Sequence, residues 1–348
     1  MKAIDFCCGA GGMTYGLELA GIKVLYGIDI DPTCKETYEF NNKNSKFLEK
    51  NLTEITCEEL KSETNIKQND DNLIFAACTP CQYWTKIQTS KSKAASSKKL
   101  IKEFKKFVEY FRPGYIVIEN VPGVYNNKKE SGLKAFIDSL SKNNYVYDEK
   151  IVNMVYYGVP QKRRRYIMIA TRTKESVSLP AEEENKDLTV RKFIGDRKLF
   201  IKRKDGYNDK TKYDHSTALL SEKNRKRIRK TKANGGNRSR WQNDPNLSIN
   251  AYKDKKKIFA DVYNRMWWDK PAPTITTKFH SLSNGRFGHP EQHRALSIRE
   301  GAWLQTFPLT YEFKHHSLVV KARHIGNAVP PEMAYRIGKY IIDIEQEC

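Results

Sequence analysis

Short apolar stretches alternate with helical patterns through the first half of this chain. Helical spacing is clearest at 98–111, where apolar residues recur every three or four positions. This alternation is typical of an α/β fold built on a doubly wound, mostly parallel sheet. Strands are predicted at 2–6, 23–30, 46–48, 72–77, 115–119, 145–154 and 165–170.

Two of these predicted strands end in residues that can do chemistry. Pro80-Cys81-Gln82 follows the run 73–77, and Glu119 and Asn120 close the next strand along the chain. Ligands of an open parallel sheet lie beyond the carboxyl ends of its strands, so a thiol and a carboxyl group are expected at one pocket. Each has an ordinary alternative, because most free cysteines act as small apolar residues and a glutamate after a strand is often only its solvated end.

Cys78 and Cys81 also match the C-x-x-C spacing of redox pairs. A thiol redox protein is therefore an alternative to nucleophilic catalysis. It requires Cys78, whereas a nucleophile requires only Cys81.

Charge and cysteine content narrow the partners and the compartment. The formal net charge is +21 and the isoelectric point about 9.5, which favours a polyanionic partner. The seven cysteines are an odd number, and no charged leader with an apolar core precedes the first strand. Reduced thiols and a cytoplasmic location are expected. No apolar stretch approaches the roughly 18 residues of a membrane span, so no membrane association is expected.

A glycine-rich turn after the first strand favours a nucleotide-like cofactor. Gly9, Gly11 and Gly12 allow the backbone to approach a ligand closely, and Asp29 ends the second strand, where a carboxylate can accept from ribose hydroxyls. Thr14 stands where the last glycine of a dinucleotide fingerprint would be. S-Adenosylmethionine, which carries no phosphate, is therefore favoured over a dinucleotide.

The region from about 174 to 264 is polar, weakly periodic and rich in basic residues. Its charge run is followed by Gly, Asn, Arg and Trp, which can approach phosphates or contact bases. A nucleic-acid surface is predicted, and a plain solvated surface is the alternative. The candidate DNA-binding residues are Lys223, Arg225, Lys226, Arg238, Arg240 and Trp241.

Six motifs occur in an order and spacing that resemble one known family. They are Asp5-Phe6-x-x-Gly9-x-Gly11-Gly12, Pro80-Cys81-Gln82, Glu119-Asn120-Val121, Gln161-x-Arg163-x-Arg165, Arg299-Glu300 with Leu304-Gln305-x-Phe307-Pro308, and Gly326-Asn327-Ala328-Val329-Pro330. Together they resemble the cytosine-5 DNA methyltransferases of bacterial restriction-modification systems. The resemblance spans nearly the whole chain outside the basic middle region.

This resemblance implies a Rossmann-like methyltransferase fold with a second, smaller domain. The expected arrangement is a catalytic and cofactor-binding domain at 1–178, a target-recognition domain at 179–314, and a C-terminal segment, 315–348, that returns to the catalytic domain.

The implied reaction explains the residue types at the predicted pocket. Cytosine C5 is a poor nucleophile, and attack of a thiolate at C6 makes the ring electron-rich. Cys81 would be that nucleophile, and Glu119 would hold the N3 and amino edge of the base. By resemblance, Arg163 and Arg165 orient the base or Glu119, Asn120 positions the cysteine loop, and Pro80 and Gln82 flank the nucleophile.

The family pattern also assigns a cofactor site, with no metal. Three departures from this pattern stand out. Asn51 replaces the aspartate that usually contacts the adenine amino group, Cys7-Cys8 replaces a small or apolar pair, and Ala77-Cys78-Thr79 replaces Gly-Gly-Pro. The expected cofactor residues are Asp5, Phe6, Cys8, Gly9, Gly11, Gly12, Asp29, Ile30, Asn51, Asn327 and Val329.

Double-stranded DNA is the expected partner, with a cognate restriction endonuclease as a further one, and the enzyme is expected to act as a monomer. A tRNA cytosine-5 methyltransferase and a non-catalytic DNA-binding protein remain alternatives. The sequence carries no transferable code for the DNA target.

Overall fold

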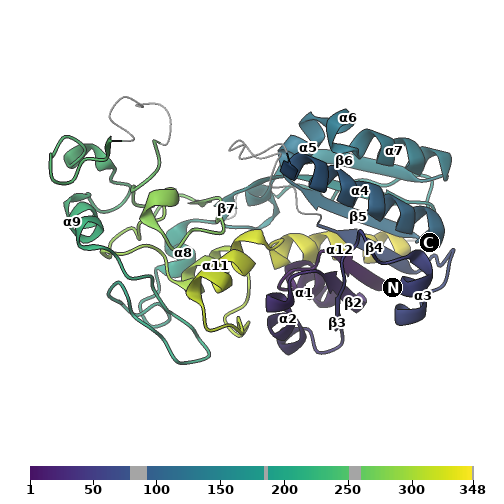
Figure 1. The fold of residues 1–348 in the computed structure, drawn as a ribbon, viewed down its shortest axis with the longest axis horizontal. Helices are drawn as coiled ribbons and strands as arrows, with labels where there is room; N and C mark the ends of the chain where they lie inside the picture. Colours follow the sequence, from purple (N-terminus) through teal and green to yellow (C-terminus); the bar gives the residue numbers. More distant parts are fainter. Residues whose placement is uncertain (79–91, 184–186, 251–259, 347–348) are drawn as a thin grey trace. The chain divides into compact units, whose positions relative to one another are not determined.

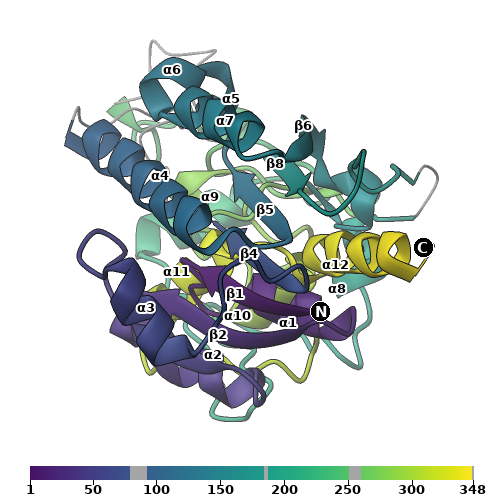
Figure 2. The same cartoon turned by 90° about the vertical axis from the view of Figure 1, so that its right-hand side faces the viewer.

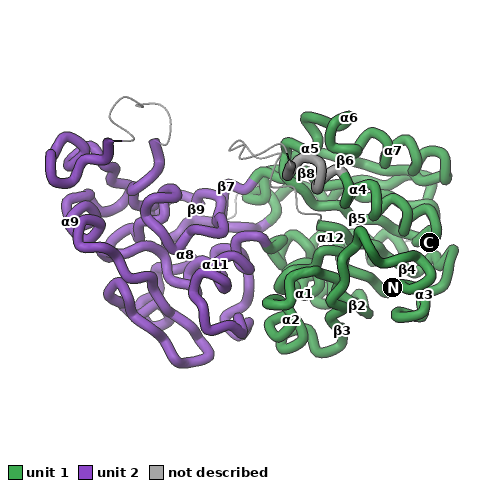
Figure 3. The backbone as a smooth tube through the Cα atoms, viewed as in Figure 1, with its two compact units in different colours: residues 1–157, 164–183, 328–348 green, residues 158–163, 184–327 purple. Residues whose placement is uncertain are grey.

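A computed structural model describes residues 1–78, 92–183, 187–250 and 260–346. The chain divides into two compact units (Figure 3). Unit 1 comprises residues 1–157, 164–183 and 328–348, and unit 2 comprises residues 158–163 and 184–327. The expected division into catalytic and target-recognition domains is a functional assignment, and it stays a prediction.

Unit 1 is built on a seven-stranded sheet. Its strands in spatial order are β3 (Lys46–Glu49), β2 (Lys23–Asp29), β1 (Lys2–Phe6), β4 (Leu73–Ala77), β5 (Tyr115–Asn120), β8 (Arg164–Thr171) and β6 (Val146–Asn153). The first five run parallel, and β8 is antiparallel to both β5 and β6. The predicted mostly parallel α/β sheet is confirmed. Strand order reverses between β1 and β4, where such sheets bind ligands at the carboxyl ends.

An aromatic cluster forms the core on one face of this sheet. The Phe6 ring lies 4.9 Å from the Phe75 ring and 5.2 Å from that of Phe104 on α4 (Ser92–Phe111). Phe104 in turn stacks on Phe136 of α7 (Leu133–Lys142) at 5.7 Å. The apolar spacing at 98–111 thus predicts the helix correctly, because its apolar stripe meets the sheet.

On the other face, α1 (Gly12–Leu19) packs against the C-terminal helix α12 (Pro331–Gln346), as Figures 1 and 2 show. The two helices approach so closely that a Cβ at Gly16 would lie 2.3 Å from the Pro331 carbonyl oxygen. A Cβ at Gly338 would lie 2.8 Å from that of Ala20. The final helix is therefore an integral part of unit 1.

Short elements connect these strands and helices. They are η1 (Pro32–Cys34), α2 (Lys35–Asn41), α3 (Cys57–Thr64), α5 (Pro122–Asn126), α6 (Lys128–Ser131) and η3 (Met154–Tyr157). Asp31 accepts a hydrogen bond from the Thr33 N–H and so caps η1, with Pro32 at its first position.

Unit 2 has little regular structure, and a small core that includes Ile228, Trp241 and Leu282 holds part of it together. Its elements are β7 (Gln161–Lys162) paired with β9 (Ala272–Pro273), α8 (Val190–Ile194), α9 (Glu222–Lys230), η4 (Arg238–Arg240), η6 (Leu282–Asn284), α10 (Ile298–Leu304) and α11 (Leu318–Asn327). The sequence pattern at 297–305 predicts helix α10, whereas the pattern at 222–230 does not predict α9. Helix α9 buries only Ile228, so its sequence lacks the apolar stripe that reveals a helix.

Within the described ranges, every helix is too short or too polar to span a lipid bilayer.

Candidate active site

Glu119 lies at the carboxyl end of β5, paired with an arginine on the neighbouring strand. Its Oε1 is 3.0 Å from Nε of Arg165 on β8, and the two side chains are only 9% and 15% exposed. Burial lowers the pKa of Arg165, and the Glu119 carboxylate opposes that shift. The predicted association of Arg165 with Glu119 is thus present in unit 1, where a buried carboxylate has its countercharge.

The strand before the predicted nucleophile ends beside Glu119. Cys78 follows β4, and its N–H donates to the Phe6 carbonyl oxygen at 3.1 Å. Burial and then the nearby Glu119 charge raise the pKa of the Cys78 thiol well above its usual value. A thiol held in this neutral form is a poor nucleophile, which disfavours the redox alternative. Pro80, Cys81 and Gln82 lie outside the described residues.

The glycine turn after β1 is held by the carboxylate that ends β2. Asp29 accepts hydrogen bonds from the backbone N–H of Gly9 at 2.8 Å and of Asp31 at 2.9 Å. Gly9 and Gly11 have φ angles of 51° and 86°, a region that favours glycine. A Cβ added to Gly9 would meet nothing within 4 Å. The turn therefore leaves open space beside Gly9.

These residues fit an adenosine-bearing cofactor. Ile30, next to Asp29, is an apolar side chain that is 62% exposed at the strand end. Asp5 is fully buried, and its Oδ1 has no hydrogen-bond partner among the described residues. An open glycine turn, a strand-end carboxylate and an exposed apolar side chain are the features that such a cofactor requires.

The remaining predicted cofactor residues take varied positions. Phe6 packs in the core, so only its backbone lies at the turn, and Cys8 is buried in a small cluster with Cys34 and Tyr38. Asn51 is engaged in its own turn, where Oδ1 accepts from the Thr53 N–H at 3.0 Å. The asparagine that replaces the family aspartate is thus a local turn residue.

Asn327 and Val329 belong to different units. Asn327 ends α11 in unit 2, and Val329 lies before α12 in unit 1. Their predicted cofactor contacts remain predictions.

Motif residues of unit 2 form a hydrogen-bonded frame. Gln161 donates to Gln305 Oε1 at 2.6 Å and accepts from the Ile275 N–H at 2.9 Å. Arg163, 1% exposed, donates to the carbonyl oxygens of Ile275 at 3.0 Å and Gly326 at 3.3 Å. Arg163 therefore supports the backbone of unit 2, a role that the family resemblance did not suggest.

Glu300 is also structural. It forms a bidentate ion pair with Arg294 at 2.6 and 2.7 Å, with both side chains fully buried. Its carboxylate accepts from the Ser297 N–H and completes a capping box at the start of α10. Burial alone would raise the pKa of Glu300, but Arg294 outweighs burial and the net shift is downward.

The basic run separates into paired and unpaired cations. Arg225 pairs with Asp205 at 2.9 Å, and Lys230 pairs with Asp244 at 2.8 Å. Lys223, Lys226 and Arg229 of α9 are exposed and have no ion-pair partner within the described part of the chain. Arg229 lies in the same basic run of the sequence but was not among the six candidates, and it is more exposed than the paired Arg225.

The three other predicted DNA-binding residues differ in exposure. Arg240 is exposed, whereas Arg238 is buried. Trp241 is 1% exposed, and its indole N–H donates to Thr231 Oγ1 at 3.0 Å. Its ring belongs to the core of unit 2, so stacking on a base would require that core to open.

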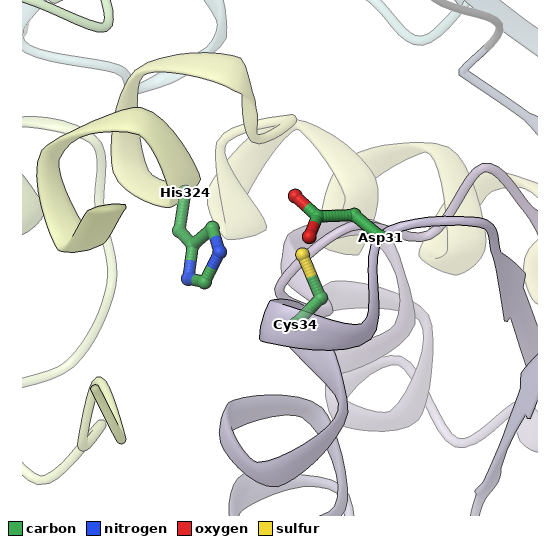
Figure 4. Close-up of side chains that lie close together, drawn as sticks. All are labelled: Asp31, Cys34 and His324. Carbon is green, nitrogen blue, oxygen red and sulfur yellow. The ribbon is translucent and has the colours of Figure 1, made fainter. Parts of the chain in front are cut away.

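Asp31, Cys34 and His324 are the three side chains drawn in Figure 4. Asp31 and Cys34 lie in unit 1 and His324 in unit 2, so these residues do not make up a metal site within either unit.

The comparisons with known proteins agree with these features. A model of the C-5 cytosine-specific DNA methylase family matches residues 1–343. The chain is 36% identical to the Type II methylase M.HgiDII of Herpetosiphon aurantiacus over 342 residues, which cover 97% of this chain and 94% of that protein. It is 28% identical to the Type II methyltransferase M1.BsuMI of Bacillus subtilis, with coverage of 96% and 78%.

Solved structures show the same fold. A prophage-encoded protein of E. coli matches with a TM-score of 0.77 and 19% identity over 99% of both chains. The S. pombe Dnmt2 methyltransferase matches with a TM-score of 0.63 and 19% identity, with coverage of 100% and 98%.

The chain therefore belongs to the C-5 cytosine-specific DNA methylase family. It is an enzyme, a DNA (cytosine-5-)-methyltransferase of the type found in restriction-modification systems. Membership implies DNA as the substrate and S-adenosylmethionine as the methyl donor.

Proposed function

We propose that this enzyme methylates C5 of one cytosine, flipped out of a specific duplex sequence, through a covalent bond between Cys81 and C6. The observation that supports it most is the buried Glu119–Arg165 pair at the end of β5. Cys78 lies two residues before Pro80 in the sequence. The nearby Glu119 charge contributes to the raised pKa of the Cys78 thiol.

The proposed steps use a thiolate and a carboxyl group. The Cys81 thiolate adds to C6, and Glu119 favours protonation at N3, which delivers the ring electrons to C5. When bound, S-adenosylmethionine supplies the methyl group that C5 attacks, and S-adenosylhomocysteine remains. The C5 proton then passes to solvent, the proton at N3 leaves, and elimination of the Cys81 thiolate gives 5-methylcytosine. Arg165 keeps Glu119 in place beside the base.

The target base must leave the duplex to reach these groups, because the C6 face is stacked inside DNA. Extrusion costs a few kcal/mol, which contacts with the phosphate backbone can offset. The unpaired cations Lys223, Lys226 and Arg229 on α9 are candidates for those contacts. We assign target recognition to unit 2 and base reading to residues that include Arg240.

The proposed cofactor site is the space above the 9–12 turn. Asp29 and Ile30 would contact the adenosine, the first through its carboxylate and the second through its exposed side chain. The proposal also includes a monomeric enzyme. It further includes a paired restriction endonuclease, which the Type II names of the relatives favour.

The test is methyl transfer from labelled S-adenosylmethionine to duplex DNA, followed by bisulfite sequencing of the product. The proposal expects label in duplex DNA, at cytosines of one short sequence. A tRNA transcript in parallel separates the RNA alternative. Label in tRNA and none in DNA would refute the DNA assignment, and adenine methylation would refute the chemistry.

A further inference from the structure

A chain of buried hydroxyl groups runs beneath the proposed cofactor turn. Thr14 Oγ1 is 2.7 Å from Asp5 Oδ2, Tyr38 Oη is 3.0 Å from Thr14 Oγ1, and Ser45 Oγ is 2.6 Å from Tyr38 Oη. All four side chains are at most 5% exposed. They come from β1, α1, α2 and the segment before β3.

Strand β2 has a glycine, Gly27, at the position next to the Tyr38 phenol. A Cβ at Gly27 on β2 would lie 2.4 Å from the Tyr38 hydroxyl oxygen. Any other residue at this position would displace the ring from Thr14. The packing of β2 is thus specific for the hydroxyl end of Tyr38.

Asp5 joins this chain to the cofactor turn. It lies on β1, four residues before Gly9, and Thr14 is the third residue of α1, which follows the turn. Helix α1 has no side-chain cap of its own. The Asp5 carboxyl group, bonded to Thr14, therefore fixes the start of α1 relative to β1, and with it the turn between them.

Each hydroxyl group has one proton, so the hydrogen bonds must all point the same way. When Asp5 is ionised, Thr14 donates to Asp5, Tyr38 to Thr14, and Ser45 to Tyr38. When Asp5 carries a proton it can donate to Thr14, and the other two bonds can then reverse. Adjacent bonds in such a chain strengthen one another.

The surroundings place the change between these two states near neutral pH. Burial raises the pKa of Asp5 to about 7, hydrogen bonds from Thr14 oppose the shift, and the Asp29 charge adds to it. The other titratable groups that interact with Asp5 are Cys8, Tyr38 and Cys78, and burial raises the pKa of each. These three stay neutral, and Asp29 is the neighbouring acidic group among the described residues. Burial raises the pKa of Asp29 as well, and hydrogen bonds from the Asp31 and Gly9 N–H groups oppose that shift.

We propose that Ser45, Tyr38, Thr14 and Asp5 form a positioning chain for the cofactor turn, whose hydroxyl protons reverse direction with the charge of Asp5. This inference rests on the proposed cofactor site. S-Adenosylmethionine carries a sulfonium charge that S-adenosylhomocysteine lacks. Ionised Asp5 therefore favours the substrate over the product, and this preference grows as pH rises through 7.

Binding of the two ligands to the full-length protein tests the chain without activity as a readout. Tyr38→Phe removes the central hydroxyl and keeps the ring. Its Kd for S-adenosylhomocysteine should rise about tenfold, as expected for a broken buried network. Tyr26→Phe is the matched control. The Tyr26 hydroxyl on β2 donates to the Glu63 carbonyl oxygen and is not part of the hydrogen-bonded series from Ser45 to Asp5. The Kd of this control variant should stay within about twofold of the wild-type value.

The pH profile separates positioning from simple support of the core. In the wild type, the ratio of the Kd for S-adenosylhomocysteine to that for S-adenosylmethionine should rise several-fold from pH 6 to pH 8. In Asp5→Asn this ratio should be flat.

Three outcomes decide the inference. Wild-type Kd values in folded Tyr38→Phe would overturn it. If Tyr38→Phe does not fold, Ser45→Ala is measured in its place. A wild-type Kd for S-adenosylhomocysteine in Ser45→Ala would overturn the inference. Failure of the wild type to bind either ligand would instead refute the proposed cofactor site.

Discussion

At the scale of single residues, Glu119 and Arg165 depend on each other because they are buried together. Removing one partner of a buried pair leaves the other charge uncompensated, at a cost of about 3–5 kcal/mol. Arg165→Ala should therefore lower kcat by at least about 100-fold, through loss of Glu119 placement. The Kd for S-adenosylhomocysteine should not change, because neither residue lies at the 9–12 turn.

Arg164→Ala is the control for this variant, since Arg164 is the exposed neighbour on the same strand. Single-turnover methyl transfer and calorimetric binding give the two quantities. Equal loss of activity in both variants would mean that activity depends on positive charge on this strand and not on the Arg165–Glu119 pair.

The strand-end residues are predictable from the sequence because a chemically active side chain directly follows an apolar run there. Glu119 closes an apolar run, and the family motifs name its partner Arg165. Nothing comparable marks Tyr38 or Ser45, which are ordinary residue types joined only by the folded chain. Trp241 is the opposite case. Its place beside arginines in the sequence is typical of a base contact, but its ring packs in the core of unit 2.

At the scale of elements, the start of α10 depends on the Arg294–Glu300 pair. Because the pKa of Glu300 is lowered on folding, the pair stabilises the protein above the unfolded-state pKa of about 4.3. This contribution is lost as pH falls further. Glu300→Gln should thus lower the free energy of unfolding by about 3–5 kcal/mol at pH 5 to 7, and by progressively less below about pH 4.

Urea unfolding across this pH range measures the difference. Glu291→Gln is the control, since Glu291 pairs with Arg197 at the surface. A difference for Glu300→Gln that does not change down to pH 3 would contradict the assignment of this stability to an ionised Glu300.

Helix α9 gives a second prediction at this scale. Gln substitutions at Lys223, Lys226 and Arg229 should weaken binding to target and scrambled duplexes alike. Each lost phosphate contact should reduce the slope of log K against log salt by about 0.9. Gln at the exposed Lys61 and Lys67 of unit 1 removes two charges outside α9 as a control. An unchanged slope in the α9 variant would mean that these cations do not contact phosphates and that the surface of α9 is only solvated.

At the scale of the whole molecule, unit 1 was more predictable than unit 2. The parallel sheet buries both faces, so its strands are continuous apolar runs such as Leu73–Ala77 and its helices carry apolar stripes. Unit 2 instead relies on buried arginines such as Arg265, which donates to the carbonyl oxygens of Thr231 and Ile228. Arginine reads as a surface residue in any sequence pattern, so this architecture could not be foreseen.

The proposed reaction depends on a covalent bond between Cys81 and the target cytosine. The direct test is a duplex with 5-fluorocytosine at the site mapped by bisulfite sequencing, incubated with S-adenosylmethionine and run on a denaturing gel. A fluorine at C5 cannot leave as a proton does, so the adduct should persist as a shifted band. Wild type and Cys78→Ser should give this band, and Cys81→Ser should not. No band from a preparation that methylates ordinary DNA, or a band that needs Cys78, would contradict this mechanism.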